Sequence, residues 1–279
     1  MYSFSLINGM AGSDPGAEVE KILSHYPSGT ADPGKLRLIF SCMDYTSLDG
    51  TDHPAKIEAF CRSALSYGEK GLPYPAAVCV YPPFVSVARE TLRGSPIRVA
   101  ATAGAFPGGQ MALHVKLEEI RYVVSEGADE VDVVIPRGML LSGNYTGVFR
   151  ELDAMREVSA GLTLKVILET GELVTPENIA RASEIAIEAG ADFIKTSTGK
   201  ITPGATEEAV WVMLKIIREH HRRTGKKVGL KPAGGIAEPA RAIALSNLVA
   251  DMLGPEWLSP GLFRVGASRL ADRLAGLIP

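Results

Sequence analysis

Five charged side chains interrupt apolar, strand-like runs of this chain, and this pattern constrains the fold more than any other feature. They are Asp44, Asp132, Lys165, Lys195 and Lys231, each in a different run. Asp and Lys are almost never fully buried unless they are paired, because removing a charge from water is costly or forces neutralisation. Five such residues in five runs therefore indicate strands that converge on one shared site.

Short apolar runs rich in β-branched residues recur along the chain and predict eight strands, separated by segments with apolar residues at helical spacing. The predicted strands are residues 36–45, 76–81, 97–103, 130–135, 163–169, 192–198, 227–231 and 262–266. Alternating strands and helices indicate an α/β protein with a parallel sheet, and eight repeats favour a single (β/α)8 TIM barrel. The alternative is an open doubly wound sheet, which is less suited to functional residues on so many strand ends.

Length and helix signals divide the chain into two parts. A barrel of this type takes about 250 residues, so the 279 residues leave roughly thirty for an extension. We assign residues 1–33 to an N-terminal extension with a short helix around 17–25, and residues 34–279 to the barrel catalytic domain. Within the barrel, Thr175 before Pro176 and Thr206 before Glu207 read as the starts of two helices.

Composition excludes several classes of protein. The net charge of −3, with mixed signs, is not typical of a nucleic-acid-binding chain. No run approaches the ~18 apolar residues of a membrane span, and the N-terminus lacks the features of a signal peptide. The three cysteines and five histidines have neither disulfide nor metal-ligand spacing. We therefore expect a cytoplasmic enzyme that uses no metal or other cofactor, binds neither nucleic acid nor membrane, and is at most a homo-oligomer.

Side-chain alternation predicts which face of each strand the charges occupy. Glu130 shares the inward face with Asp132, and Lys165 and Lys195 fall on the inward faces of their own strands. Most of the charges lie in the later half of a strand, near the carboxyl ends where barrel active sites form. A structural salt-bridge network that fills the barrel interior is the alternative interpretation, although such networks are rarely favourable for stability alone.

Two lysines close together have a specific chemical use. A free lysine has a pKa of about 10.4 and is a poor nucleophile at neutral pH, but burial and a neighbouring cation both lower that pKa. The neutral amine can then form a Schiff base with an aldehyde or ketone. A carboxylate on a third strand can move the proton that the following bond cleavage requires. Lys195, Lys231 and Asp132 fit these three roles, and none of them needs a metal.

Glycine pairs after the last strands indicate a phosphate site. KPAGGI and GASRL place Gly234, Gly235 and Gly266 where backbone amides can approach a ligand closely, and TGKI adds Lys200 beside another glycine. In barrels, this part of the mouth is the usual place for a phosphate group. Because three such segments follow neighbouring strands, the sequence favours a phosphorylated substrate.

From about residue 36 to residue 274 the chain resembles the 2-deoxyribose-5-phosphate aldolases, a family of metal-independent, Schiff-base (class I) aldolases. The segments that carry the resemblance are GADEVDVVIP, LKVILETGEL, AGADFIKTSTGK and GLKPAGGI, supported by MDYTSLDGTD, AAVCVYPPFV and RVGAS. The resemblance implies reversible cleavage of 2-deoxy-D-ribose 5-phosphate into acetaldehyde and D-glyceraldehyde 3-phosphate.

The resemblance also implies a role for individual residues. Lys195 is the Schiff-base nucleophile, Lys231 is the neighbouring cation that lowers its pKa, and Asp132 takes part in proton transfer. Lys165 and Asp44 support that set. The residues expected to line the pocket or bind the substrate and its phosphate are Thr46, Cys79, Thr198, Lys200, Gly234, Gly235, Gly266 and Ser268.

Two departures from the family pattern affect these expectations. The chain ends in AGLIP, whereas many relatives end in a tail with a terminal tyrosine, and Ala237 stands where some relatives have an arginine. The phosphate must then rely on backbone amides and on Lys200 or Arg269. Two other functions remain open, namely a Schiff-base aldolase for a keto-sugar phosphate and a catalytically silent sugar-phosphate-binding barrel.

Overall fold

The computed structural model describes residues 14–26 and 32–279. Residues 1–13 and 27–31 of the predicted extension lie outside the described residues. The described part of the extension holds helix α1 (Pro15–Leu23), which begins after Asp14 because the carboxylate of Asp14 accepts hydrogen bonds from the amides of Gly16 and Ala17. Helix α2 (Pro33–Ser41) starts at the boundary we assigned between extension and barrel, and that division remains a prediction.

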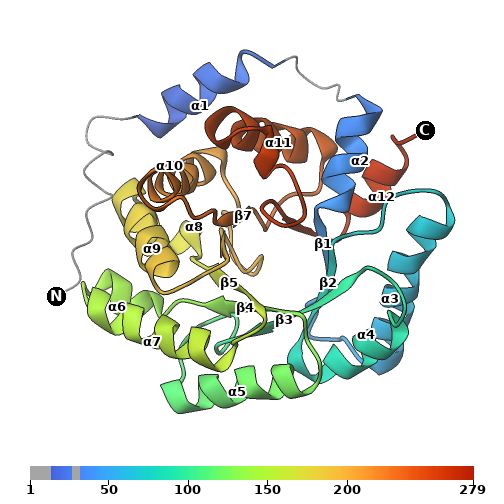
Figure 1. Cartoon of the computed structure of the whole chain (residues 1–279), viewed down its shortest axis with the longest axis horizontal. Coiled ribbons are helices and arrows are strands. Elements are labelled where there is room, and N and C mark those ends of the chain that lie inside the picture. Colours follow the sequence, from blue (N-terminus) through green and yellow to red (C-terminus); the bar gives the residue numbers. More distant parts are fainter. Residues whose placement is uncertain (1–13, 27–31) are drawn as a thin grey trace.

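Eight parallel strands form the nearly closed barrel that the sequence predicts, with the helices outside them (Figure 1). The strands are β1 (Met43–Thr46), β2 (Ala77–Val80), β3 (Arg98–Ala103), β4 (Glu130–Val134), β5 (Thr163–Ile167), β6 (Phe193–Lys195), β7 (Gly229–Lys231) and β8 (Val265–Ala267). Their order around the barrel is β7-β6-β5-β4-β3-β2-β1-β8. Parallel bridges from Leu230 to Phe263 and from Ala233 to Gly266 join the β7 side to the β8 side.

The helices follow the strands and cover the outside of the barrel. They are α3 (Pro54–Glu69), α4 (Val85–Thr91), α5 (Leu113–Ser125), α6 (Arg137–Leu141), α7 (Tyr145–Val158), α8 (Thr170–Leu173), α9 (Pro176–Glu188), α10 (Glu207–Thr224), α11 (Pro239–Leu253) and α12 (Leu270–Ala275), with 3-10 turns η2 (Pro82–Phe84) and η3 (Pro255–Trp257). The two predicted helix starts are confirmed. The Thr175 side chain accepts from the Asn178 amide, and that of Thr206 accepts from the Ala209 amide.

The predicted strand at residues 36–45 is wrong for its first part, because residues 36–41 belong to helix α2. Asp32 caps this helix by accepting from the Lys35 amide at 3.0 Å, and Pro33 occupies the first helical turn. Leu36, Ile39 and Phe40 are buried at helical spacing, so an apolar run that resembles a strand is an amphipathic helix. The strand itself begins only at Met43.

Strand register places the charged residues at matching heights in the barrel. Asp132 pairs with Lys165 between β4 and β5, and Lys195 pairs with Lys231 between β6 and β7. Side chains of paired residues in a parallel sheet point to the same side, so these four meet inside the barrel. Within the described ranges, no helix is both long enough and apolar enough to cross a membrane.

Candidate active site

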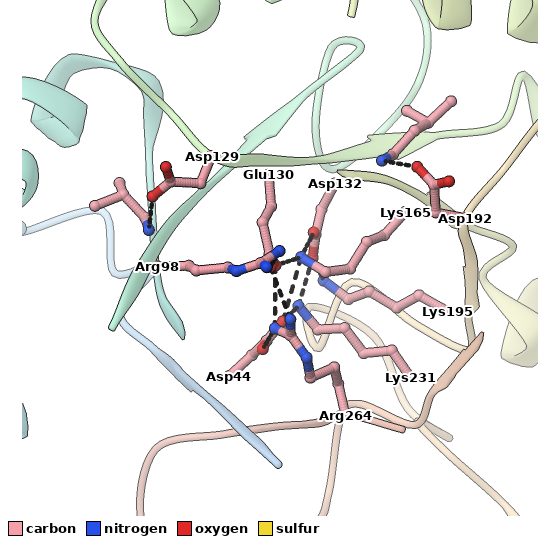
Figure 2. Close-up of polar contacts among 12 residues, drawn as sticks. Asp44, Arg98, Asp129, Glu130, Asp132, Lys165, Asp192, Lys195, Lys231 and Arg264 are labelled. Atoms are coloured by element: carbon pink, nitrogen blue, oxygen red, sulfur yellow. Dashed lines mark hydrogen bonds and ion pairs between the residues drawn. The ribbon is translucent and has the colours of Figure 1, made fainter. Parts of the chain in front are cut away.

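The barrel interior holds a cluster of buried ionisable side chains that come from six strands or their immediate ends (Figure 2). The structure brings together all five charged residues that the sequence singled out, and adds two more. The members of this lumen cluster are Asp44, Glu130, Asp132, Lys165, Lys195, Lys231 and Arg264. All seven are buried, so their charges are satisfied mainly by neighbouring side chains rather than by water.

Asp132 lies at the centre of the lumen cluster and accepts from three lysines. Its Oδ1 atom is 2.8 Å from the Nζ atom of Lys165. Its Oδ2 atom is 2.8 Å from the Nζ atom of Lys195 and 2.6 Å from that of Lys231. Burial alone would raise the pKa of Asp132, but the three lysines together hold it well below its usual range. Asp132 is therefore an ionised acceptor that joins the lysines of three strands.

A second layer of the lumen cluster lies beneath Asp132. Arg264 donates to Asp44 Oδ1 at 2.5 Å and to Glu130 Oε1 at 2.7 Å. Lys165 lies 2.5 Å from Glu130 Oε2, and Lys231 forms an ion pair with Asp44. Burial would raise the pKa of both carboxyl groups, but the adjacent cations lower it. Both carboxylates are therefore ionised and paired.

The lysines of the lumen cluster differ in the direction of their pKa shifts. Burial lowers the pKa of each, but Asp132 and Asp44 outweigh burial at Lys165 and Lys231 and raise the pKa of both. At Lys195, burial dominates over the attraction of Asp132, and Lys231 lowers the pKa further. Lys195 is thus the lysine most easily deprotonated. Burial is the larger cause, and the neighbouring cation that the sequence emphasised is a smaller one.

A cavity of about 230 Å³ opens above the lumen cluster, and Lys195 is the one lysine of the cluster that lines it. The lining residues are Thr46, Leu48, Asp49, Lys195, Thr198, Gly199, Lys200, Ala233, Gly234, Gly235, Ile236, Ala237, Gly266, Ala267, Ser268 and Arg269. Lys195 is the last residue of β6 and is only 2% exposed, so its amine lies at the floor of the cavity. This is the carboxyl-terminal side of the barrel, where barrel enzymes bind their substrates.

The structure separates the predicted site residues into two groups. Among the predicted substrate-binding residues, those that line the cavity are Thr46, Thr198, Lys200, Gly234, Gly235, Gly266, Ser268 and Arg269. Cys79 does not line it. Cys79 is fully buried on β2, where burial and then Asp132 raise the pKa of its thiol. Asp44, Asp132, Lys165 and Lys231 do not line the cavity, and of these four Asp132 contacts Lys195 directly.

Glycines shape the wall of the cavity that the sequence associates with phosphate. Gly234 and Gly235 both have positive φ angles, 86° and 75°, which side chains with a Cβ atom rarely adopt. The Gly234 carbonyl accepts from the amide of Ala205 at 3.1 Å, so the segment before α10 packs against the glycine pair. Lys200 donates from Nζ to the Leu48 carbonyl across the mouth. Arg269 is exposed at the rim.

The sequence reasoning missed Arg264 and Glu169. Arg264 lies in a predicted strand, residues 262–266, and the rule that found the five other charges applies to it equally.

Glu169 is 1% exposed with a φ of 59°, and its carboxylate accepts from the amide and hydroxyl of Thr198. Thr198 Oγ1 in turn accepts from the Lys200 amide at 3.1 Å. Glu169 therefore holds the loop that carries Lys200. It is the last residue of the predicted strand 163–169, which in the structure ends at Ile167, and its charge at the end of that apolar run was the available signal.

We find no group of three or more His, Cys, Asp and Glu side chains arranged to hold a metal ion in residues 14–26 and 32–279.

Similarity to known proteins agrees with this geometry. Residues 39–252 match the model of the DeoC/LacD family aldolases. The human deoxyribose-phosphate aldolase is 45% identical over 241 residues, which cover 82% of this chain and 76% of the human protein. A Caenorhabditis elegans protein described as a putative deoxyribose-phosphate aldolase is 39% identical over 267 residues, which cover 91% of this chain and 86% of that protein.

Solved structures show the same fold. The crystal structure of a putative deoxyribose-phosphate aldolase from Coccidioides immitis superimposes with a TM-score of 0.75 at 26% identity, covering 95% of this chain and 98% of that one. A putative deoxyribose-phosphate aldolase from Toxoplasma gondii superimposes with a TM-score of 0.79 at 25% identity, covering 88% of this chain and 94% of that one. With a family model that matches most of its length, the chain belongs to the DeoC/LacD family of aldolases.

Proposed function

We propose that this chain is a deoxyribose-phosphate aldolase that reversibly cleaves 2-deoxy-D-ribose 5-phosphate into acetaldehyde and D-glyceraldehyde 3-phosphate. The observation that carries the proposal is the position of Lys195. It is the lysine of the lumen cluster that reaches the cavity, and it is the one whose pKa is lowered. A neutral amine at the floor of a cavity can attack the carbonyl carbon of a substrate. The names of the most similar relatives support the same substrate.

In the first stage, the Lys195 amine adds to the C1 aldehyde of the open-chain sugar. Loss of water from the resulting carbinolamine gives a protonated Schiff base, which withdraws electrons from the C2–C3 bond. Removal of the proton from the C3 hydroxyl then breaks this bond. The products are D-glyceraldehyde 3-phosphate and a two-carbon enamine that remains attached to Lys195.

In the second stage, C2 of the enamine takes up a proton, and water hydrolyses the Schiff base to release acetaldehyde and the free amine. We assign these proton movements to Asp132 and Lys231. Asp132 accepts a hydrogen bond from the Lys195 amine, and Lys231 donates to the same Asp132 oxygen. The low pKa of Asp132 favours its ionised form. We therefore expect Asp132 to orient a water molecule that transfers the proton, rather than to carry the proton itself. Lys165 and Asp44 hold the pair in place from below.

The phosphate of the substrate is assigned to the wall formed by Gly234, Gly235, Gly266 and Ser268. Backbone amides at glycine-rich turns can approach phosphate oxygens closely. Ala237 supplies no charge there, so we assign the compensating cations to Lys200 and Arg269, which line the same cavity. Thr46 and Thr198 also line this cavity, and we assign them to the substrate hydroxyls. Cys79 is assigned to the packing beneath the reacting carbons.

Acetaldehyde release tests the proposal. Incubation with 2-deoxy-D-ribose 5-phosphate should produce acetaldehyde, measured by coupling to an alcohol dehydrogenase. An aldolase for a keto-sugar phosphate would release no acetaldehyde, and a silent binding barrel would release no product at all. Added chelator should leave the rate unchanged. Reduction with borohydride in the presence of acetaldehyde, followed by peptide mapping, should find the adduct on Lys195.

We propose that the enzyme is cytoplasmic, binds neither nucleic acid nor membrane, and has no protein partner other than copies of itself. Cell fractionation and light scattering coupled to size-exclusion chromatography test the location and the oligomeric state.

A further inference from the structure

Arg264 and Glu130 form an ion pair (Figure 2). The pair lies at the base of the lumen cluster, away from the cavity. Arg264 directly precedes β8, and Glu130 is the first residue of β4. Two contacts join them, from Nη2 to Oε1 at 2.7 Å and from Nη1 to Oε2 at 3.1 Å. Neither residue lines the cavity, so neither has a direct role in binding a substrate.

This ion pair is nevertheless connected to the lysines above it. Glu130 contacts Lys165, and Arg264 contacts Asp44, which pairs in turn with Lys231. Lys165 and Lys231 both donate to Asp132, and Asp132 is the carboxylate to which Lys195 donates. A change of charge at the base of the lumen cluster is therefore transmitted to Lys195 through buried groups, where water screens it little.

The charges of the lumen cluster are uneven in number. Four members are basic, namely Lys165, Lys195, Lys231 and Arg264, and three are acidic, namely Asp44, Glu130 and Asp132. With all seven ionised, the buried cluster would carry an excess of one positive charge. An uncompensated buried charge is unfavourable, so the composition of the lumen cluster favours the neutral form of one basic member.

Arg264 cannot be the neutral member of the lumen cluster, so the neutral member must be a lysine. A guanidinium group cannot be deprotonated in a protein, and its planar fork reaches Asp44 and Glu130 at the same time. With Arg264 as a permanent cation on two of the three carboxylates, the excess charge falls on a lysine. Of the three lysines in the lumen cluster, Lys195 is the one with a single carboxylate partner, so it is held least firmly in its charged form.

We propose that Arg264 is a positioning residue for catalysis, and that its permanent charge, held by Glu130, keeps Lys195 neutral and nucleophilic. The proposal rests on the proposed function, because it takes Lys195 as the Schiff-base lysine. The groups that act directly on the Lys195 amine are Asp132 (β4), Lys231 (β7) and Cys79 (β2). Asp44 (β1), Glu130 (β4), Lys165 (β5) and Arg264 (before β8) are joined to Asp132 and Lys231 by ion pairs. On the cavity side, the charged residues are Asp49, Lys200 and Arg269.

The test measures how readily Lys195 is trapped by acetaldehyde and cyanoborohydride as the pH is varied. Only the neutral amine reacts, so the midpoint of this profile reports the titration of Lys195. Arg264→Met removes a cation, which makes the charged form of Lys195 less unfavourable. We expect the midpoint to move upward by on the order of one pH unit, with turnover recovered at higher pH.

Opposite changes in the same ion pair separate an electrostatic role from a structural one. Glu130→Gln removes an anion and should move the midpoint downward. The double variant Glu130→Gln/Arg264→Met removes one charge of each sign and should return the midpoint to the wild-type value. Arg98→Met is the matched control, because Arg98 contacts the same Glu130 at 3.4 Å but its side chain is 55% exposed to water. Its midpoint should stay at the wild-type value.

The outcomes are distinguishable. Unchanged midpoints in folded Arg264→Met and Glu130→Gln, or shifts of both in one direction, overturn the proposal. If Arg264→Met does not fold, the downward shift in Glu130→Gln and its reversal in the double variant still decide the question. Failure to trap Lys195 in the wild-type protein would instead overturn the proposed function.

Discussion

Lys195 and Lys231 donate to the same oxygen atom of Asp132, with their Nζ atoms 2.8 Å and 2.6 Å from Oδ2. Two ammonium groups this close repel each other, so a single carboxylate oxygen favours one charged and one neutral amine. Lys231 has a second partner in Asp44, whereas Lys195 has Asp132 alone among the described residues. The proton is therefore held more firmly by Lys231 than by Lys195, which lines the cavity.

We expect Lys195→Ala to abolish reductive trapping by acetaldehyde. Mass spectrometry of the intact protein after borohydride treatment measures the adduct directly. Lys231→Ala should still be trapped, but more slowly at neutral pH, because losing the neighbouring cation lets the pKa of Lys195 rise. An adduct mapped to Lys231 or Lys165 in the wild-type protein would contradict the assignment.

Asp132→Asn should reduce kcat by roughly 10²–10⁴, the usual scale for losing a general acid–base group. The variant should also have a lower Tm, because three buried lysines lose their shared carboxylate. Steady-state kinetics and circular dichroism at the same temperature separate the two effects. Asp129→Asn is the matched control: the same chemical change near the start of the same strand, but at a residue paired with Arg89 on the outside. Its kcat should be unchanged, and a comparable loss in both variants would argue against a catalytic role for Asp132.

The buried carboxylates should make the protein sensitive to acid. The pKa values of Asp44, Glu130 and Asp132 are lowered in the folded state, so their contribution to stability is present above their unfolded pKa values, about 3.9 and 4.3. It is lost as the pH falls below those values, because the unfolded chain then binds more protons. Denaturant titrations between about pH 7 and pH 3 should show a steep fall in the free energy of unfolding.

That acid dependence should be flatter in the Glu130→Gln/Arg264→Met variant, which lacks one of the three carboxylates. A variant of an exposed ion pair, Glu58→Gln, should keep the wild-type dependence, since exposed pairs contribute little. Equal slopes in all three proteins would show that the lumen cluster is not the source of the acid sensitivity.

Arg269→Ala should weaken binding of the phosphorylated substrate by about 1–3 kcal/mol, the range for a hydrogen bond to a charged group. Values of kcat/KM for 2-deoxyribose 5-phosphate and for 2-deoxyribose measure this, and the unphosphorylated sugar should be little affected. Arg273→Ala is the control, because Arg273 belongs to the helix that follows Arg269 but does not line the cavity. Equal losses on both sugars, or none on either, would remove Arg269 from the phosphate site.

Gly204→Ala should raise KM for the phosphorylated substrate by about tenfold, the scale of one hydrogen bond to a charged group. A Cβ atom at residue 204 would lie 2.4 Å from the Gly234 carbonyl oxygen, so the glycine pair would have to move. Gly50→Ala is the control, since a Cβ atom there meets nothing within 4 Å. An unchanged KM in Gly204→Ala would mean that the position of Gly234 is not critical for the phosphate.

Apolar patterning predicted the barrel because apolar, β-branched residues recur in eight separate runs, even where a charged residue interrupts a run. The error at residues 36–41 arose because a buried helix and a buried strand have similar compositions, and only the cap at Asp32 and the packing of α2 distinguish them. The inward face of each charged strand followed from alternation alone. Alternation within the predicted strand 163–169 would also have placed Glu169 on the inward face beside Lys165. The strand in fact ends at Ile167 and Glu169 has a left-handed conformation, so its contact with Thr198 depends on the tertiary structure.

The sequence by itself determined that charged residues on several strands would share the barrel interior, since strand alternation and the cost of burying a charge are local properties of the chain. It also determined that the glycines after the last strands would meet at one mouth. Only the tertiary structure decided which of the three lysines has a lowered pKa. That choice depends on how many carboxylates each amine contacts, and on Arg264, whose fixed charge reaches Lys195 only through Asp44, Glu130 and Asp132. Electrostatic coupling depends on distances between residues far apart in the chain, and those distances exist only once the barrel has closed.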